Sequence, residues 1–395
     1  MSAMKRLFQL MSDKKASDIF LTVGAPINIK INGVAMPVNQ TVLNAEAVRT
    51  LLYEVLNEKQ IREYEDEMEL NMAFALEGVG AFRISAFRQK GSPAVVVRFI
   101  PGSVPAFETL GLPDILKEII MQKRGLILIV GATGSGKSTS LSAMLDLRNQ
   151  QKSGHILTLE DPVEFIFTNK KSLVNQREVG TDTKSFEIAL KNALRQAPDC
   201  ILIGEIRDKQ TMGMALAYAQ SGHLALATLH ANNSYHAMNR IISFYPLENR
   251  PTLLLDLSAA LQAIVSQRLV RTKTGARRAA VEVLLNTRHI AELIEKGDVN
   301  EIKDAMEKSM SPGSQTFEQS LFAMFMDGAI TQDECMTNAD SATNMLWLIN
   351  QATAGTISAG GAPAAGDKKD EKKDAALSTT SQGASFSDFK IDASV

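Results

Sequence analysis

The sequence predicts an α/β protein, because three features of its pattern occur together. Short apolar runs alternate with helical stretches from about residue 114 to residue 351, as a parallel sheet covered by helices requires. A glycine-rich segment follows the first apolar run and precedes a helical pattern. The first hundred residues carry strand and hairpin signals of their own. We therefore expect a large α/β domain preceded by a smaller one.

Composition narrows the class of protein. A chain of 395 residues is too long for one hydrophobic core and suggests two or three domains. The net charge of −2 gives no overall attraction to nucleic acid or to an anionic membrane. No apolar stretch reaches the ~20 residues that span a bilayer, and the first residues suggest a short helix rather than a signal peptide. The two cysteines, far apart, favour a reducing cytoplasm and exclude a four-thiolate zinc site.

The chain divides into four expected segments. Residues 1–100 predict a small α/β domain, with a hairpin at Asn32-Gly33 and a helix capped by Asn44. Residues 101–113, rich in proline and glycine, read as a linker. Residues 114–351 form the large domain, and residues 352–395 have the composition of a disordered tail. The strands expected in the large domain are Leu126–Val130, His155–Leu159, Cys200–Ile203, Leu224–Thr228 and Ala279–Leu285.

The segment from Gly131 to Ser138 is a complete phosphate-binding loop pattern, placed between a buried strand and a helix. Glycines let backbone N–H groups curl around a polyphosphate, and the helix N-terminus adds partial positive charge. Lys137 would reach the β- and γ-phosphates, and the Ser138 hydroxyl would hold Mg²⁺. A glycine-rich surface turn is the alternative. The expected ATP-binding residues are Gly131, Ala132, Thr133, Gly134, Ser135, Gly136, Lys137, Ser138 and Thr139.

Hydrolysis needs carboxylates beside the metal and the attacking water, and two clusters offer them. Glu160, Asp161 and Glu164 follow the strand at His155, where open α/β sheets form their sites. Three solvated loop acids are the alternative interpretation. Glu205 follows the strand Cys200–Ile203 as a Walker B glutamate does, although Gly204 replaces the usual preceding aspartate.

A third block contains His223, Thr228 and His230 around the strand Leu224–Thr228. Thr228 and His230 end this strand, so they should point into the same crevice as the carboxylates. Each histidine taken alone is more often a satisfied structural residue than a site residue.

These four blocks in this order resemble the type II/IV secretion ATPase superfamily, and within it the type IV pilus retraction ATPases. The resemblance covers roughly the first 350 residues, including Ser17–Leu21 and Phe82–Arg88 of the small domain. It implies a RecA-like P-loop ATPase core with a smaller α/β, PAS-like N-terminal domain. The string from Gly204 to Asp208 is the family's own form of Walker B, which removes the objection raised by the missing aspartate.

The resemblance also implies roles, position by position. Glu164 would position the attacking water, Glu205 would act on the metal side, and Thr228 and His230, with His223 in the same His box, would sense the γ-phosphate. Arginines that reach the nucleotide would neutralise charge in the transition state. The candidates are Arg83, Arg88, Arg98 and Arg207. A solvated strand face is the alternative for those in the N-terminal domain.

One departure separates two branches of the family. PilT-type motors carry an Ala-Ile-Arg-Asn-Leu-Ile-Arg-Glu helix, whereas the matching stretch here, His289–Glu295, keeps the apolar spacing without either arginine. This resembles the accessory PilU-type retraction ATPases.

The resemblance implies a homohexamer in the cytoplasm, at the inner-membrane face of the pilus machine. Expected partners are a PilT-type motor and the inner-membrane platform protein, with membrane association only through them and no nucleic acid.

Three alternatives remain open. The first is a pilus assembly or type II secretion ATPase of the same superfamily. The second is a docking subunit with vestigial hydrolysis. The third is a nucleic-acid translocase, although no basic patch interleaved with aromatics supports it.

Overall fold

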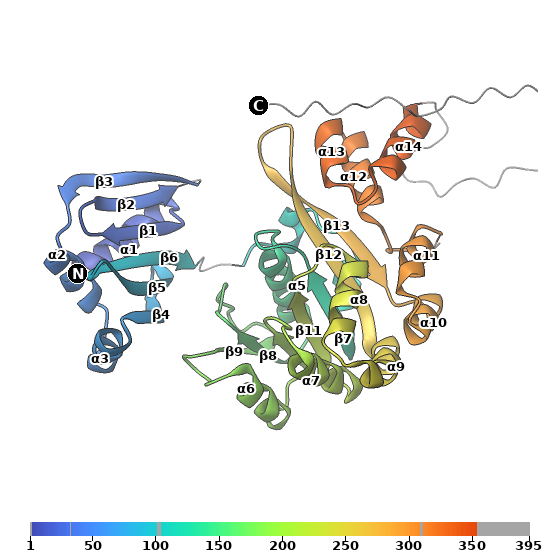
Figure 1. The fold of residues 1–395 in the computed structure, drawn as a ribbon, viewed down its shortest axis with the longest axis horizontal. Helices are drawn as coiled ribbons and strands as arrows, with labels where there is room; N and C mark the ends of the chain where they lie inside the picture. Colours follow the sequence, from blue (N-terminus) through green and yellow to red (C-terminus); the bar gives the residue numbers. More distant parts are fainter. Residues whose placement is uncertain (1, 32, 101–103, 309–310, 354–395) are drawn as a thin grey trace, which may run out of the picture.

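The computed structural model describes residues 2–31, 33–100, 104–308 and 311–353, and it contains two separate sheets (Figure 1). The predicted tail from residue 352 lies outside the described residues apart from its first two, which end the last helix. Within the described part of the chain, no helix combines the length and the apolar character needed to cross a bilayer.

The N-terminal sheet is antiparallel throughout, with strand order β3-β2-β1-β6-β5-β4. The predicted hairpin is confirmed, because Ile31 pairs with Val34 across the turn. The predicted cap is also confirmed: the Asn44 side chain accepts the Ala47 N–H at 2.8 Å. The core includes stacked Phe8 and Phe82 rings, with centroids 4.2 Å apart. The elements are α1 (Ala3–Lys14), β1 (Asp18–Thr22), β2 (Pro26–Ile31), β3 (Val34–Val42), α2 (Ala45–Tyr53), α3 (Glu58–Glu67), β4 (Glu69–Leu76), β5 (Gly80–Gln89) and β6 (Ser92–Ile100).

The larger sheet has the order β13-β12-β7-β11-β10-β8-β9 and is parallel except for the edge pair β12–β13. Its strands are β7 (Gly125–Val130), β8 (Gly154–Glu160), β9 (Ser172–Glu178), β10 (Cys200–Ile203), β11 (Leu224–Leu229), β12 (Leu261–Arg271) and β13 (Arg277–Leu285). The expected strands are confirmed to within two residues at each end.

Two strands, β9 and β12, were not predicted from the sequence. β9 is an edge strand whose sequence is mostly polar, with only Ser172 and Glu178 buried at its ends. β12 directly follows a helix and carries buried Ser266 and Gln267 in its middle. Neither pattern resembles the continuous apolar run of a central parallel strand.

Helices cover both faces of the larger sheet, as Figure 1 shows. One core cluster joins α6 (Phe186–Ala193), α7 (Lys209–Gln220), α8 (Ser234–Ser243), α9 (Arg250–Ala260), α10 (Arg288–Lys296) and α11 (Ile302–Lys308) to the sheet. The other joins α4 (Ile115–Ile120) and α5 (Lys137–Gln151), with η1 (Phe107–Leu110). Phe107 and Leu112, both in the predicted linker, are buried in this second cluster.

A separate helical group packs against the β12–β13 hairpin. It consists of α12 (Phe317–Met326), α13 (Gln332–Asn338) and α14 (Ala342–Thr353). Its own core includes Phe317 and Leu321, which meet Val270 of β12 and Ala280 of β13.

We predict that Arg148→Met destabilises the larger domain by about 2–4 kcal/mol. Arg148 is buried in α5 and donates to the carbonyls of Ile120 at 2.6 Å and Gln122 at 2.9 Å. Methionine would leave both carbonyls without this donor. Urea denaturation followed by circular dichroism measures the change. Arg240→Met, on exposed α8 surface, is the control and should cost less than about 1 kcal/mol. Equal losses for the two variants would contradict the prediction.

Candidate functional site

The glycine-rich loop leads from the end of β7 into the first turn of α5, and two of its glycines are required by space. A Cβ on Gly131, whose φ is +156°, would lie 2.6 Å from the Gln267 carbonyl oxygen. One on Gly136, at φ +86°, would lie 2.7 Å from Gln267 Nε2. Ala132, Thr133 and Gly134 form an exposed tip. The loop therefore exposes a tip on which only Ala132 and Thr133 carry side chains, and it packs its inner side against β12.

Gln267 of β12 holds this loop, and sequence reasoning missed it. Its side-chain Nε2 donates to the Ser135 carbonyl oxygen at 2.8 Å, and the residue is buried. The only available signal was a polar residue within a strand that was itself not predicted.

Lys137 begins α5 and turns back over the loop. Its Nζ donates to the carbonyls of Gly131 at 2.8 Å and Ala132 at 2.9 Å. Burial lowers the pKa of Lys137, while Glu205 and Glu164 act in the opposite direction. Phosphate oxygens could replace the two carbonyls as acceptors for the ammonium group. Ser138 and Thr139 follow it, partly buried, in the same turn.

The remaining motifs reach the same edge because of strand register. β7, β11, β10 and β8 are consecutive neighbours and all parallel. Val130 pairs with Leu229, and Ile203 pairs with both Ala227 and Leu159. The residues that follow these strands therefore share the carboxyl edge of the sheet.

The three acids after β8 differ in environment. Glu160 is buried and accepts from Thr158 Oγ1 at 2.6 Å and Gln176 Nε2 at 3.2 Å. Burial raises the pKa of Glu160 despite these hydrogen bonds. Asp161 and Glu164 are exposed. Only these two are free to meet a ligand, whereas Glu160 is enclosed by its own domain.

Glu205 joins the other motifs. One of its carboxylate oxygens lies 3.4 Å from His230 Nε2, and the other accepts from Arg207 Nε at 2.8 Å. Arg207 also lies 3.6 Å from Asp161. Asp161 after β8, Glu205 after β10 and His230 after β11 are therefore linked, with Arg207, in one chain of contacts.

Gly204 stands where a Walker B aspartate usually stands, and the structure supplies the physical reason. Its N–H donates to the Leu159 carbonyl at 2.7 Å, and its own carbonyl accepts the Thr228 hydroxyl. A Cβ there would lie 3.0 Å from the Leu159 carbonyl oxygen and 3.2 Å from Glu160 Cα. The backbone of β8 would have to move by a few tenths of an ångström to admit any side chain at this position.

The three candidate arginines of the N-terminal domain have different partners. Arg83 donates to the Val163 carbonyl at 3.3 Å and interacts electrostatically with Glu178, Glu164 and Asp161. Arg88 instead pairs with Glu65, within its own domain. Arg98 pairs with Asp18 at 2.9 Å. Among these three, only Arg83 contacts the turn that carries the acids.

His223 does not join the assembled site. It precedes β11, whereas His230 follows it, so the length of the strand separates them by about 20 Å. Its ring nitrogen Nδ1 lies 3.0 Å from the Ser221 hydroxyl. The block that contains both histidines therefore spans the two ends of one strand, and the structure brings Thr228 and His230, but not His223, to the carboxyl edge.

We predict that Gly204→Asp, which restores the usual Walker B aspartate, destabilises this chain rather than improving the site. The added side chain would push on the backbone of β8, at a cost of about 1–3 kcal/mol, and would place another negative charge near Glu160 and Glu205. Gly204→Ala separates the two effects, since it adds the carbon without the charge. Thermal unfolding measures both variants. A melting temperature at or above that of the parent for Gly204→Asp would refute the steric explanation.

Comparison with known proteins agrees with this arrangement. The family model of type II/IV secretion system proteins matches residues 2–337. The type IV pilus ATPase PilU of Pseudomonas aeruginosa is 48% identical over 346 residues, which cover 87% of this chain and 91% of that protein. The type IV pilus retraction ATPase PilT of the same organism is 38% identical over 338 residues, 86% of this chain and 98% of that protein.

Solved structures give the same result. The crystal structure of the pilus retraction motor PilT with bound ADP superposes with a TM-score of 0.82 at 38% identity, covering 88% of this chain and 99% of that one. The ATPase DotB of Legionella pneumophila gives a TM-score of 0.72 at 26% identity, covering 85% and 94%. With its phosphate loop, its linked acidic and histidine motifs and these relatives, the chain belongs to the family of type II/IV secretion system proteins.

Proposed function

We propose that this protein is an ATP hydrolase that powers or assists type IV pilus retraction, as a PilU-type partner of a PilT-type motor. The names of its relatives, which are pilus ATPases and a pilus retraction motor, support the class of ATP hydrolase. The contacts of Glu205 carry the proposal, because they bring three motifs to one point beside the phosphate loop. The charges of Glu205 and Glu164 both act to raise the pKa of Lys137, so the phosphate loop and these two acids are close enough to interact electrostatically.

The residues present fit a nucleotide with Mg²⁺. Glycine is required at positions 131 and 136, and the resulting bare loop suits a polyphosphate. Within the described residues, no cluster of three or more His, Cys, Asp or Glu side chains could hold a metal by itself. Ser138 and Glu205 would therefore hold Mg²⁺ together with the phosphates, Glu205 through water. The ion would neutralise charge on the phosphoryl oxygens.

The acids after β8 would have different roles in hydrolysis. Glu164, exposed and close enough to Lys137 to influence its pKa, would orient the attacking water. Glu160 would keep the turn in place through Thr158 and Gln176. His230 and Thr228 would respond to the γ-phosphate through their contacts with Glu205 and the Gly204 carbonyl.

Arg83 would couple the nucleotide to the N-terminal domain. It is half-buried on β5 and touches the turn between Asp161 and Glu164. Hydrolysis that rearranges this turn would therefore move one domain against another. In the proposed assembly, a cytoplasmic homohexamer passes this motion to a platform protein of the inner membrane.

The outer face of α10 favours the accessory role. Ile290, Leu293 and Ile294 are buried, so the exposed side carries Glu292 and Glu295 rather than the arginines of a PilT-type motor. The same face also carries Arg288, which pairs with Glu292 at 3.1 Å, and Lys296, so the difference is the absence of the two motif arginines and not a reversal of charge. A partner that binds through those two arginines would therefore not find them here. We therefore propose that the protein acts together with a PilT-type motor and does not drive retraction alone.

The test measures phosphate release by the purified chain alone, with a PilT-type motor, and with the platform protein added. Glu164→Gln should lower kcat by at least about a hundredfold, because it removes the group that orients water, while ATP affinity changes little. Lys137→Ala should lose both binding and turnover, and twitching should fall in cells carrying either variant. A parent chain that releases no phosphate in any combination would rule out the proposal. Full twitching with Lys137→Ala would favour a docking subunit instead.

Arg83 provides a second test. Arg83→Ala should lower kcat at least about tenfold, because a cation near Glu164 and the phosphates is lost. Arg88→Ala, on the same strand but paired with Glu65, should leave kcat within about twofold. Steady-state kinetics at saturating ATP compares the two. Similar losses for both variants would argue against a specific role for Arg83.

A further inference from the structure

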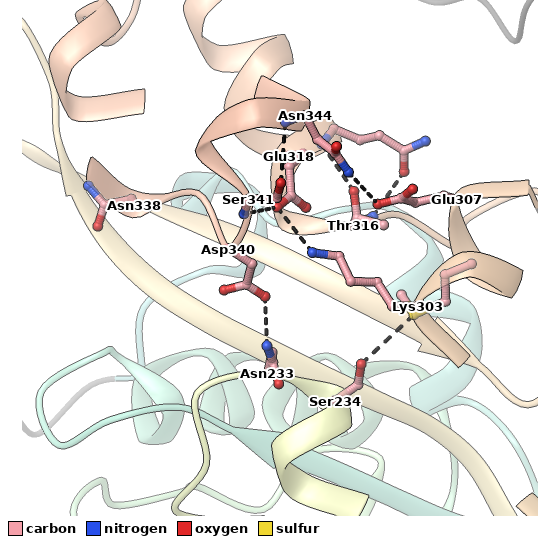
Figure 2. A network of polar contacts seen from close by, with 12 residues as sticks. Asn233, Ser234, Lys303, Glu307, Thr316, Glu318, Asn338, Asp340, Ser341 and Asn344 are labelled. Atoms are coloured by element: carbon pink, nitrogen blue, oxygen red, sulfur yellow. Dashed lines mark hydrogen bonds and ion pairs between the residues drawn. The ribbon is translucent and has the colours of Figure 1, made fainter. Parts of the chain in front are cut away.

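The loop between β11 and α8 runs from His230 to Asn233, and its last two residues and Ser234, the first residue of α8, are each anchored to other elements. The Asn232 carbonyl accepts from Arg268 at 3.2 Å. Asn233 Nδ2 donates to Asp340 at 2.7 Å. The Ser234 N–H donates to buried Glu282 of β13 at 2.7 Å. Figure 2 shows Asp340 above Asn233, at the start of α8. The segment carrying His230 is therefore tied to other elements.

Arg268 and Asp340 form the centre of these anchors. They are ion-paired, with 22% and 14% of their side chains exposed. The Arg268 guanidinium also donates to the Asn338 carbonyl and lies 4.0 Å from the Phe317 ring centroid. Asn338 ends α13, Asp340 precedes α14, and Phe317 begins α12. One guanidinium thus contacts the His230 loop, α12, α13 and the segment between α13 and α14.

We propose that Arg268 and Asp340 are positioning residues for His230, through which helices α12–α14 set how the protein recognises the γ-phosphate. The proposal rests on the proposed function, since it assigns a control to the same nucleotide site. Neither residue touches the nucleotide in this scheme. A protein that binds the C-terminal helices would then alter ATP recognition without reaching the phosphate loop.

The geometry makes Asp340 a suitable residue to change. Asn233 caps α8 through Oδ1, which accepts the His236 N–H at 2.9 Å. The bond to Asp340 uses the other side-chain atom, Nδ2. Asp340→Ala therefore removes one of the three anchors of this segment, together with the ion pair to Arg268, and leaves the helix cap in place. Arg268 keeps its contacts with Asn338, Asn232 and Phe317.

The experiment compares the affinities of the full chain for ADP and for a non-hydrolysable ATP analogue, which differ in the γ-phosphate. Asp340→Ala should weaken binding of the analogue about tenfold, with ADP binding within about twofold of the parent. Asp340→Asn, which keeps an acceptor oxygen, should recover part of the loss. Arg268→Met should behave as Asp340→Ala does.

Lys303→Met is the matched control. Lys303 of α11 pairs with buried Glu318 of α12 at 3.3 Å, and Figure 2 shows this pair beside the anchors. It should lower the melting temperature without changing the ratio of the two affinities. Equal losses for ADP and the analogue in Asp340→Ala, no loss at all, or the same selective loss in Lys303→Met would overturn the inference. A parent chain that binds neither nucleotide would instead overturn the proposed function, and this inference with it.

Discussion

The parallel alignment of β7, β11, β10 and β8 is the constraint on which the site depends. These strands are buried, and their registers bring the residues after each one to a single edge. The motif residues that follow these strands, from Gly131 after β7 to His230 after β11, therefore lie on turns at the same edge, where they can meet. Hydrophobic burial on both faces of the sheet stabilises this arrangement, so the polar site is held by apolar packing some distance from it.

Within the site, burial decides which polar groups are available for chemistry. The side chains of Glu160 and Gln267 are buried and form hydrogen bonds within the protein. Glu160 stabilises the acidic turn, and Gln267 stabilises the phosphate loop. Glu164 and His230 remain exposed at the same edge. The enclosed groups fix the backbone, which lets the exposed ones stay accessible without being loosely held.

Much of the fold and of the candidate site could be predicted from the sequence, and each feature that was missed has a physical cause. Continuous apolar runs marked the central strands, and glycine spacing marked the phosphate loop. β12 escaped because Ser266 and Gln267 interrupt its apolar pattern, and the Gln267 contact joins residues 132 positions apart. Sequence could not choose between Arg83, Arg88 and Arg98, because all three lie on strands of the same sheet and the choice depends on which partner each one meets.

The position of β12 has a consequence of its own. Gln267 and Arg268 are consecutive in this strand, so their side chains leave opposite faces, one towards the phosphate loop and one towards the loop of His230. A slip of β12 by one residue against β7 would reverse the two faces and present a guanidinium where an amide now sits. The phosphate loop and the loop of His230 are thus both held by the alternation of a single strand, and an insertion or deletion within it would disturb both together.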